Sequence, residues 1–189
     1  ERKYGKILVM QMCILFLFIK PCLYLIIYWF ITDLAELKLI DLSCSRNLIE
    51  IPDLSGAPKL KQLILQHCTR LYKIHSSLGD LKQLIRLDLN GCKCLESLPH
   101  KISLEALEIF DLGGCSKLKK FPEIVGNMSC LLELCLSETT INELPFSVEY
   151  FTGITKLDLR DCINLLSLSN GCCCLMSLKI SLCLAAQKL

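Results

Sequence analysis

The sequence has no Gly-x-x-x-x-Gly-Lys-[Ser/Thr] phosphate-binding loop, so no nucleotide-binding site of that kind is assigned to it. It also lacks a strong charge of one sign, because 21 Lys and Arg nearly balance 19 Asp and Glu, for a net charge of +2. The densest basic cluster, Lys117, Lys119 and Lys120, is small and is interpreted as a solvated face. We therefore do not expect nucleic-acid binding.

Residues for catalysis or metal binding are equally scarce. No nucleophile, base and orienting group stand at an interpretable spacing, so we predict no catalytic residues and no enzymatic activity. His67, His75 and His100 fall at different phases of the repeat described below, which argues against a clustered site. The consecutive cysteines at 172–174 cannot all point one way and have no Cys-x-x-Cys partner. We expect neither a metal nor a cofactor.

What the sequence does have is a leucine repeat. The frame Leu-x-x-Leu-x-Leu-x-x-Cys-x-x-Leu-x-x-Leu-Pro recurs, with variations, every 23 or 24 residues, a period typical of leucine-rich repeats. Six copies begin at Leu37, Leu60, Leu84, Leu107, Leu131 and Ile154, and a partial seventh begins at Leu175. We therefore predict an α/β fold over residues 34–189, a leucine-rich-repeat solenoid, or horseshoe, with a parallel concave sheet. Each unit would bury its apolar face against its neighbours.

Each unit has two halves. The Leu-x-Leu alternation predicts a short strand with its two leucines inward and the intervening residue outward. The second half reads Leu-x-x-Leu-Pro-x-x-Ile or close to it, and in the fourth unit Val125 takes the Ile position. It predicts an extended return path, where proline is tolerated because no ladder donor is needed. Short helical or 3₁₀ turns are expected at residues 77–81 and 124–128.

The cysteines follow the same frame. Five of the 14 occupy one slot of the repeat, namely Cys68, Cys92, Cys115, Cys162 and Cys183. We expect an inward-facing column in which each thiol donates weakly to loop backbone. Ser45 and Thr139 take this slot in two units and still offer a donor. Reduced thiols imply a cytosolic or nuclear setting.

The chain between Ile7 and Ile31 is almost entirely apolar and lies outside the repeat frame. As one helix it is long enough to span a bilayer, and we expect residues 1–33 to precede the repeats as an apolar, helical segment. It is interpreted as a transmembrane helix, a signal peptide or a mistranslated boundary. Basic residues before it would place the repeats outside the cytoplasm, which conflicts with reduced thiols.

Strand alternation identifies the outward residues that would line the concave sheet. They are Asp41, Ile64, Asp88, Asp111, Cys135 and Asp158, flanked by polar side chains that suit a protein partner. The candidate partner-binding residues are Asp88, Asp111, Asp158, Arg86, Lys156 and Arg160. A metal site made by two of these aspartates is not expected, because adjacent strands supply no third ligand.

Several segments resemble one family of plant proteins: Leu37-Lys-Leu-Ile-Asp-Leu42-Ser, Ile51-Pro-Asp-Leu-Ser-Gly56, Leu60-Lys-Gln-Leu-Ile-Leu65, Ser77-Leu-Gly-Asp-Leu81-Lys and Leu89-Asn-Gly-Cys92. The chain resembles the leucine-rich-repeat region of plant disease-resistance proteins that carry a Toll/interleukin-receptor domain and a nucleotide-binding domain, the tobacco mosaic virus resistance type. The resemblance implies a soluble, cytoplasmic fragment that lacks those two domains. It implies that the repeats sense effectors and restrain the nucleotide-dependent switch.

The implied partners are a pathogen effector, a guarded host protein or the receptor's own nucleotide-binding domain. Two other interpretations of the repeats stay open. One is a membrane-anchored or secreted receptor-like protein, for which the sequon Asn127-Met-Ser129 would matter. The other is a substrate adaptor of a ubiquitin ligase, although residues 1–33 do not resemble the helical segment it would need.

Overall fold

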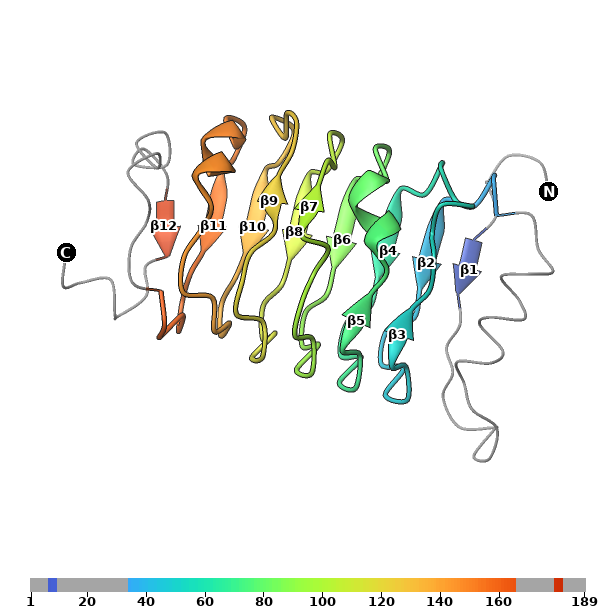
Figure 1. Ribbon diagram of the computed structural model, residues 1–189, viewed down its shortest axis with the longest axis horizontal. Coiled ribbons are helices and arrows are strands. Elements are labelled where there is room, and N and C mark those ends of the chain that lie inside the picture. The colour runs from blue at the N-terminus through green and yellow to red at the C-terminus, as the bar shows by residue number, and fades with distance from the viewer. Residues whose placement is uncertain (1–6, 10–33, 166–178, 182–189) are drawn as a thin grey trace.

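The computed structural model describes residues 7–9, 34–165 and 179–181. In this part of the chain, eight short parallel strands form one continuous sheet and stand side by side along the long axis of the molecule (Figure 1). In sheet order they are β1 (Ile7–Val9), β2 (Leu39–Asp41), β4 (Gln62–Ile64), β6 (Arg86–Asp88), β8 (Ile109–Asp111), β10 (Glu133–Cys135), β11 (Lys156–Asp158) and β12 (Lys179–Ser181). One strand per repeat confirms the predicted solenoid with a parallel sheet.

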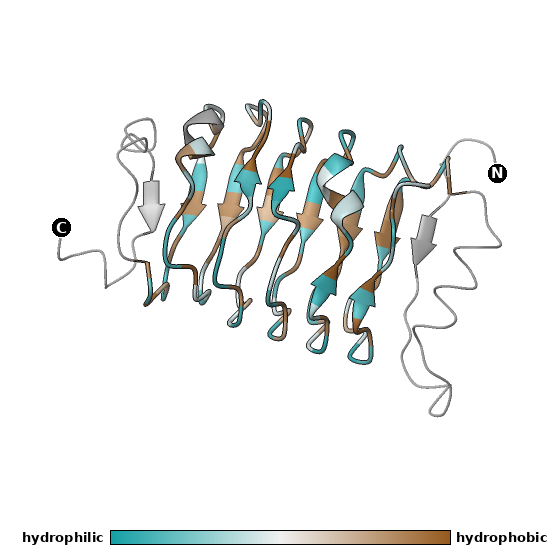
Figure 2. Ribbon diagram, viewed as in Figure 1, coloured by the Kyte–Doolittle hydropathy of each residue, from teal (hydrophilic) through white to brown (hydrophobic). Residues whose placement is uncertain are grey.

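The strands stack in register, so equivalent residues of successive coils form rows. Ile40 of β2 is paired with Leu63 of β4, which is paired with Leu87 of β6, and all three are fully buried. The residues on either side point away from the core, and the strands in Figure 2 change from brown to teal accordingly. The alternation read from the sequence therefore sets which face of the sheet is apolar.

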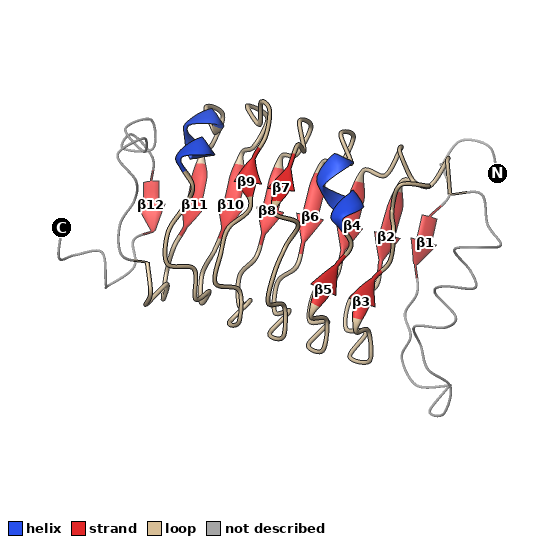
Figure 3. Ribbon diagram, viewed as in Figure 1, coloured by secondary structure: helices blue, strands red, loops and turns tan. Residues whose placement is uncertain are grey.

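The return path also contains regular structure. Strands β3 (Glu50–Ile51) and β5 (Lys73–Ile74) form one two-stranded parallel sheet, and β7 (Lys101–Ile102) and β9 (Glu123–Ile124) form another. Two 3₁₀ helices, η1 (Ser76–Asp80) and η2 (Phe146–Tyr150), are the blue segments in Figure 3. The expected turn at residues 77–81 is thus confirmed, one residue earlier than predicted.

The turn expected at residues 124–128 was wrong. Ile124 ends β9 and is buried, whereas Val125, which takes the Ile position of the repeat frame, is 44% exposed. Gly126 follows with φ of +101°, a conformation that glycine adopts without the strain imposed by a Cβ atom. Pairing with β7 therefore keeps this return path extended, and Ile124 is the residue that points into the core.

The slot cysteines form the predicted column. Each donates its S–H to a carbonyl of the preceding coil: Cys68 to Leu42 (3.1 Å), Cys92 to Leu65 (3.1 Å), Cys115 to Leu89 (3.3 Å) and Cys162 to Leu136 (2.9 Å). Thr139 instead donates to Leu136 of its own coil, at 2.7 Å. Ser45 Oγ is buried and has no partner among the described residues. We had expected both substitutes to donate to loop backbone as the cysteines do. This was wrong for Ser45, and Thr139 donates within its own coil and not to the preceding one. Cys183 lies outside the described residues.

At the start of the chain, Ile7–Val9 is a strand, where a helix was expected. This strand, β1, pairs in parallel with β2, with Ile7 opposite Leu39 and Val9 opposite Asp41. The physical reason is that the first repeat strand presents unpaired backbone groups at its edge, and β-branched Ile and Val suit a strand. The remaining residues of the apolar segment, 10–33, lie outside the described residues, as do residues 172–174 and Leu175.

Candidate recognition surface

The outward face of the main sheet carries the predicted candidate residues. The third residue of each strand is aligned across the coils, so Ile64 is next to Asp88, Asp88 is next to Asp111, and Cys135 lies between Asp111 and Asp158. The structure thus places all six candidates on one face. It joins four of them in two ion pairs, Arg86 with Asp88 and Arg160 with Asp158, and does not gather the six into a single cluster.

The aspartates of this row close the turns that follow the strands. Their side chains accept the backbone N–H two residues later: Asp41 from Ser43 (3.0 Å), Asp88 from Asn90 (3.3 Å), Asp111 from Gly113 (2.8 Å) and Asp158 from Arg160 (3.1 Å). This is the Asx turn, which competes with a continuing strand. The recurring Asp-Leu-x signal was in the sequence, but we had assigned it to partner contact.

A second row of constrained residues immediately precedes the cysteine slot. In all six described coils this residue has φ between 56° and 73°: Cys44, His67, Gly91, Gly114, Glu138 and Asp161. Only glycine takes this left-handed conformation without strain, so four coils hold a strained residue at the turn. The signal that could have revealed the row was the pair of glycines, Gly91 and Gly114, at equivalent positions.

Asp88 is the most buried of the candidates. Its side chain is fully shielded from solvent and accepts hydrogen bonds from Arg86 Nη2 and Gln66 Nε2, both at 2.7 Å. Arg86 keeps 37% of its side chain exposed, although its Nε is buried without a partner among the described residues. Asp88 therefore positions Arg86, and Arg86 is the member of the pair that a partner can touch.

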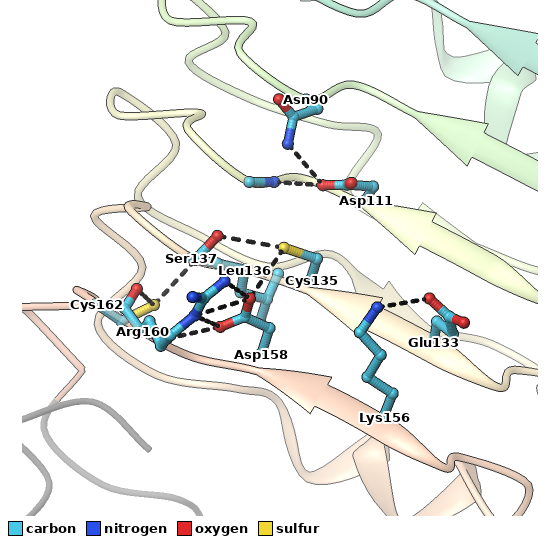
Figure 4. Close-up of polar contacts among 11 residues, drawn as sticks. Asn90, Asp111, Glu133, Cys135, Leu136, Ser137, Lys156, Asp158, Arg160 and Cys162 are labelled. Carbon is cyan, nitrogen blue, oxygen red and sulfur yellow. Dashed lines mark hydrogen bonds and ion pairs between the residues drawn. The ribbon is translucent and has the colours of Figure 1, made fainter. Parts of the chain in front are cut away.

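Asp158 and Arg160 form the second pair. Arg160 donates from Nη2 (2.7 Å) and Nε (2.9 Å) to the carboxylate, and these bonds hold the pKa of Asp158 below its usual range. Figure 4 shows Cys135 and Ser137 beside this pair, with Cys135 Sγ 3.3 Å from Ser137 Oγ and 3.9 Å from Asp158 Oδ2. Burial raises the pKa of Cys135, so this thiol stays protonated at neutral pH.

The last two candidates have simpler environments. Lys156 Nζ lies 3.1 Å from Glu133 Oε2 on the adjacent strand, which raises the pKa of the lysine (Figure 4). Asp111 has no cationic partner among the described residues and accepts a hydrogen bond from Asn90 Nδ2 at 3.3 Å. The face therefore presents Lys156 and Arg160, each paired with an acid, the carboxylate of Asp111, which has no cationic partner among the described residues, and Arg86 above the buried Asp88.

Gly113 is a structural residue of this face that sequence reasoning missed. A Cβ added there would lie 2.9 Å from Asn90 Nδ2 and 3.1 Å from both Cys135 Sγ and Ser137 Oγ. Contacts this short force neighbouring side chains to move. A glycine at this position allows three polar side chains from neighbouring coils to pack closely.

Asp53, His75 and Ser77 come together on the return path and superficially resemble a catalytic triad. His75 Nδ1 lies 3.0 Å from Ser77 Oγ and 3.6 Å from Asp53 Oδ1, so both groups meet the same ring nitrogen. A triad needs them on opposite nitrogens. Ser77 Oγ also accepts the Leu54 N–H at 2.7 Å, which makes this a cap that joins two coils.

Two further observations concern alternative functions. In the described part of the chain, no three His, Cys, Asp or Glu side chains lie close enough together to hold a metal ion. Among residues 7–9, 34–165 and 179–181, no helix has both the length and the apolar character needed to cross a bilayer.

Comparison with known proteins identifies relatives of this chain. It is 38% identical over 160 residues to TMV resistance protein N of Nicotiana glutinosa, which covers 82% of this chain and 14% of the relative. Disease resistance protein RPP2A of Arabidopsis thaliana is 35% identical over 130 residues, covering 69% of this chain and 10% of the relative. The chain is homologous to plant disease resistance proteins. This confirms the resemblance to the leucine-rich-repeat region of the Toll/interleukin-receptor type.

Disease resistance protein RPP5 of the same species matches at 36% identity over 120 residues, 64% of this chain and 8% of the relative. The chain thus spans about a seventh or less of the length of these relatives. No family model matches it. Among solved structures, the Leptospira interrogans LRR protein LIC12759 covers 78% of this chain and 66% of its own at 14% identity and a TM-score of 0.22.

Proposed function

We propose that this chain is the protein-recognition module of a plant intracellular immune receptor, which senses effectors and restrains the receptor's switch. The partner is a pathogen effector, a guarded host protein or the receptor's own nucleotide-binding domain. The module comprises residues 34–189, about six full repeats and a partial seventh, and residues 1–33 form an apolar N-terminal segment, of which Ile7–Val9 pairs with the first repeat strand. The homology to disease resistance proteins supports a role in defence.

The observation that carries the proposal is the ordered polar face of the main sheet. Neighbouring strands lie about 4.8 Å apart, so the six strands of the complete repeats present a face about 25 Å long, which suits a protein and exceeds a metabolite. Its polar side chains are fixed by hydrogen bonds in advance, which lowers the entropy that binding must overcome. The proposed contact residues are Arg86, Asp111, Lys156 and Arg160, with Asp88 and Asp158 holding the two arginines in place.

A cytoplasmic location is part of the proposal. Four slot cysteines donate buried S–H groups to backbone carbonyls, for example Cys92 to Leu65. A disulfide would remove those donors, so the column favours a reducing compartment. Neutral thiols buried in this way are also poor nucleophiles, which supports a structural role for the column.

The proposed mechanism is differential binding. A ligand that contacts the sheet face better when the repeats are released from the switch domain shifts the equilibrium toward the released state. The size of the shift equals the difference between the two binding free energies, so no chemical step in the repeats is needed.

Site-specific photo-crosslinking in plant cells tests this proposal. A photoreactive amino acid replaces Gln62 on the sheet face, or Lys73 on the return path as the matched control, since both are exposed first residues of strands. Crosslinked proteins are identified by mass spectrometry, and binding of the purified candidate to the chain is then measured. We expect crosslinks from position 62 that are at least several-fold stronger than those from position 73.

A charge-swap variant sharpens the test. Glu133→Lys with Lys156→Glu keeps the ion pair between β10 and β11 but reverses what each strand presents, so folding should be preserved while partner binding weakens about tenfold. Equal crosslinking from positions 62 and 73 would rule out the sheet face as the recognition surface. So would a purified partner that binds the charge-swap variant and Arg160→Ala as tightly as it binds the unmodified chain.

A further inference from the structure

The residues immediately before six of the main-sheet strands, β2, β4, β6, β8, β10 and β11, form one continuous row, which we call the strand-start row. Its members are Lys38, Lys61, Ile85, Glu108, Leu132 and Thr155. The backbone N–H of each member donates to the carbonyl of the member before it, over 2.7 to 2.9 Å. The row is thus held straight by the backbone, and all its members except the half-buried Ile85 are exposed.

The charges of this row are not compensated within the described structure. Lys38, Lys61 and Glu108 have no ion-pair partner there, whereas the neighbouring face has three ion pairs: Arg86 with Asp88, Lys156 with Glu133 and Arg160 with Asp158. The row is also asymmetric, with two cations at its beginning and one carboxylate further along. Exposed charges left unpaired beside a surface of internally paired charges are available to a partner.

Apolar side chains lie between and beyond these charges. Leu132 is 41% exposed and Ile85 is half-buried, as is Ile109 of β8, whose backbone N–H donates to the Ile85 carbonyl. Aliphatic groups flanked by charge form the usual anatomy of a protein contact, an apolar centre with a polar rim. A polyanion such as nucleic acid fits poorly, because Lys61 would attract it and Glu108 would repel it.

We propose that the strand-start row binds an extended segment of a partner protein that runs across the strands. An acidic side chain of the segment meets Lys38 and Lys61, a basic side chain meets Glu108, and apolar side chains cover Ile85 and Leu132. The proposal rests on the proposed recognition function and names the partner's chemistry. Four strand spacings of about 4.8 Å from Lys38 to Leu132 correspond to about six extended residues.

The probe for the test is a displayed library of random twelve-residue peptides, selected on the immobilised full chain. From Lys61 to Glu108 is about 10 Å, and alternate side chains of an extended segment share a face. The selected peptides should therefore carry an acidic and a basic residue two or four positions apart, next to apolar residues. The key variant, Lys61→Glu with Glu108→Lys, should select peptides with the reversed charge order. Peptides selected on the unmodified chain should bind this variant about tenfold more weakly.

The matched control is Lys93→Glu with Glu143→Lys, since both residues are exposed and without ion-pair partners in the described structure but lie outside the row. This control should select the same peptides as the unmodified chain, and circular dichroism should show all variants folded. Enrichment that the row variant leaves unchanged overturns the proposal.

Two other outcomes also count against the row. A library without enrichment together with a concentration-dependent dimer would show that a second copy covers the row, and this overturns the proposal. If crosslinking from position 62 succeeds while the row variant has no effect, recognition stands and only the strand-start row fails.

Discussion

Raising the pH should destabilise the solenoid, because its buried thiols resist ionisation. Burial raises the pKa of Cys68 to about 11 and that of Cys115 to about 12, from an ordinary value of 9.0, and it raises the pKa of Cys92 as well. In the unfolded chain these thiols ionise near pH 9. Above that pH the unfolded state binds fewer protons than the folded state, so the free energy of unfolding falls as pH rises.

The magnitude follows from the number of thiols. Each contributes up to about 1.4 kcal/mol per pH unit while it is ionised in the unfolded state and neutral in the folded state. Integrated from pH 8.5 to 10, each thiol contributes about 1.3 kcal/mol, and the three together about 4 kcal/mol. This is a large fraction of the 5 to 15 kcal/mol that stabilises a typical domain. Ion pairing raises the pKa of Lys82 and Lys156 in the folded state, which acts in the same direction, but both add little below pH 10 because an unfolded lysine loses its proton only near pH 10.5.

The assay is urea unfolding followed by far-ultraviolet circular dichroism at several pH values between 7 and 10, with a phosphine reductant present. The control is Cys92→Ala, which lowers stability at neutral pH but should reduce the pH-dependent loss by about a third. A loss below about 1 kcal/mol between pH 8.5 and 10, or an unchanged loss in the control, would show that these thiols ionise as easily in the folded state, and would refute the buried column.

Two further predictions concern single residues. Gly91 and Gly114 share the left-handed conformation, so alanine at either should cost about 1 to 2 kcal/mol. Gly91→Ala should cost at least about 1 kcal/mol more than Gly114→Ala, because the added Cβ would meet the ring of His67. Combining Gly91→Ala with His67→Ala should remove that excess. Equal urea midpoints for Gly91→Ala and Gly114→Ala would contradict this prediction. Ser45→Ala should leave stability unchanged or raise it by up to about 1 kcal/mol, because it removes a buried hydroxyl that has no partner among the described residues. Thr139→Val removes a 2.7 Å hydrogen bond and should cost about 1 kcal/mol. If thermal unfolding showed Ser45→Ala to be less stable than Thr139→Val, the hydrogen bonding described for these two hydroxyls would be wrong.

The main sheet was predictable because its cause is local and repeated. The Leu-x-Leu alternation alone decides which side chains of Arg86–Asp88 point inward, and the 23- or 24-residue period aligns each strand with the next. The return path was less predictable, because its inward positions depend on pairing with a neighbouring coil. Ile124 is buried and Val125 exposed because β9 pairs with β7, and no local pattern distinguishes these two β-branched residues.

The burial of the candidate residues could not be read from the sequence. Asp88 and Asp111 occupy the same position in successive strands, yet only Asp88 is completely shielded. The difference comes from Gln66, two residues beyond the preceding strand, and from Arg86, whose long side chain folds back over the carboxylate. Side-chain packing between coils decides such contacts, so alternation identifies the face of the sheet but not which groups a partner can reach.

Two kinds of position on this surface differ in how freely they can change. An outward aspartate such as Asp111 closes the turn after its strand, so replacing it costs a hydrogen bond and disturbs the backbone. A strand-start residue contributes its backbone to the ladder, and Thr155 adds a side-chain hydrogen bond from its Oγ1 to the Leu132 carbonyl. Exposed side chains without such a bond, such as those of Lys61 and Glu108, can change at little cost to stability. The chain itself illustrates this, since equivalent positions hold Lys61, Ile85 and Glu108, while the leucine before each is buried. Binding specificity is therefore more readily altered at the strand start than at the turn aspartates.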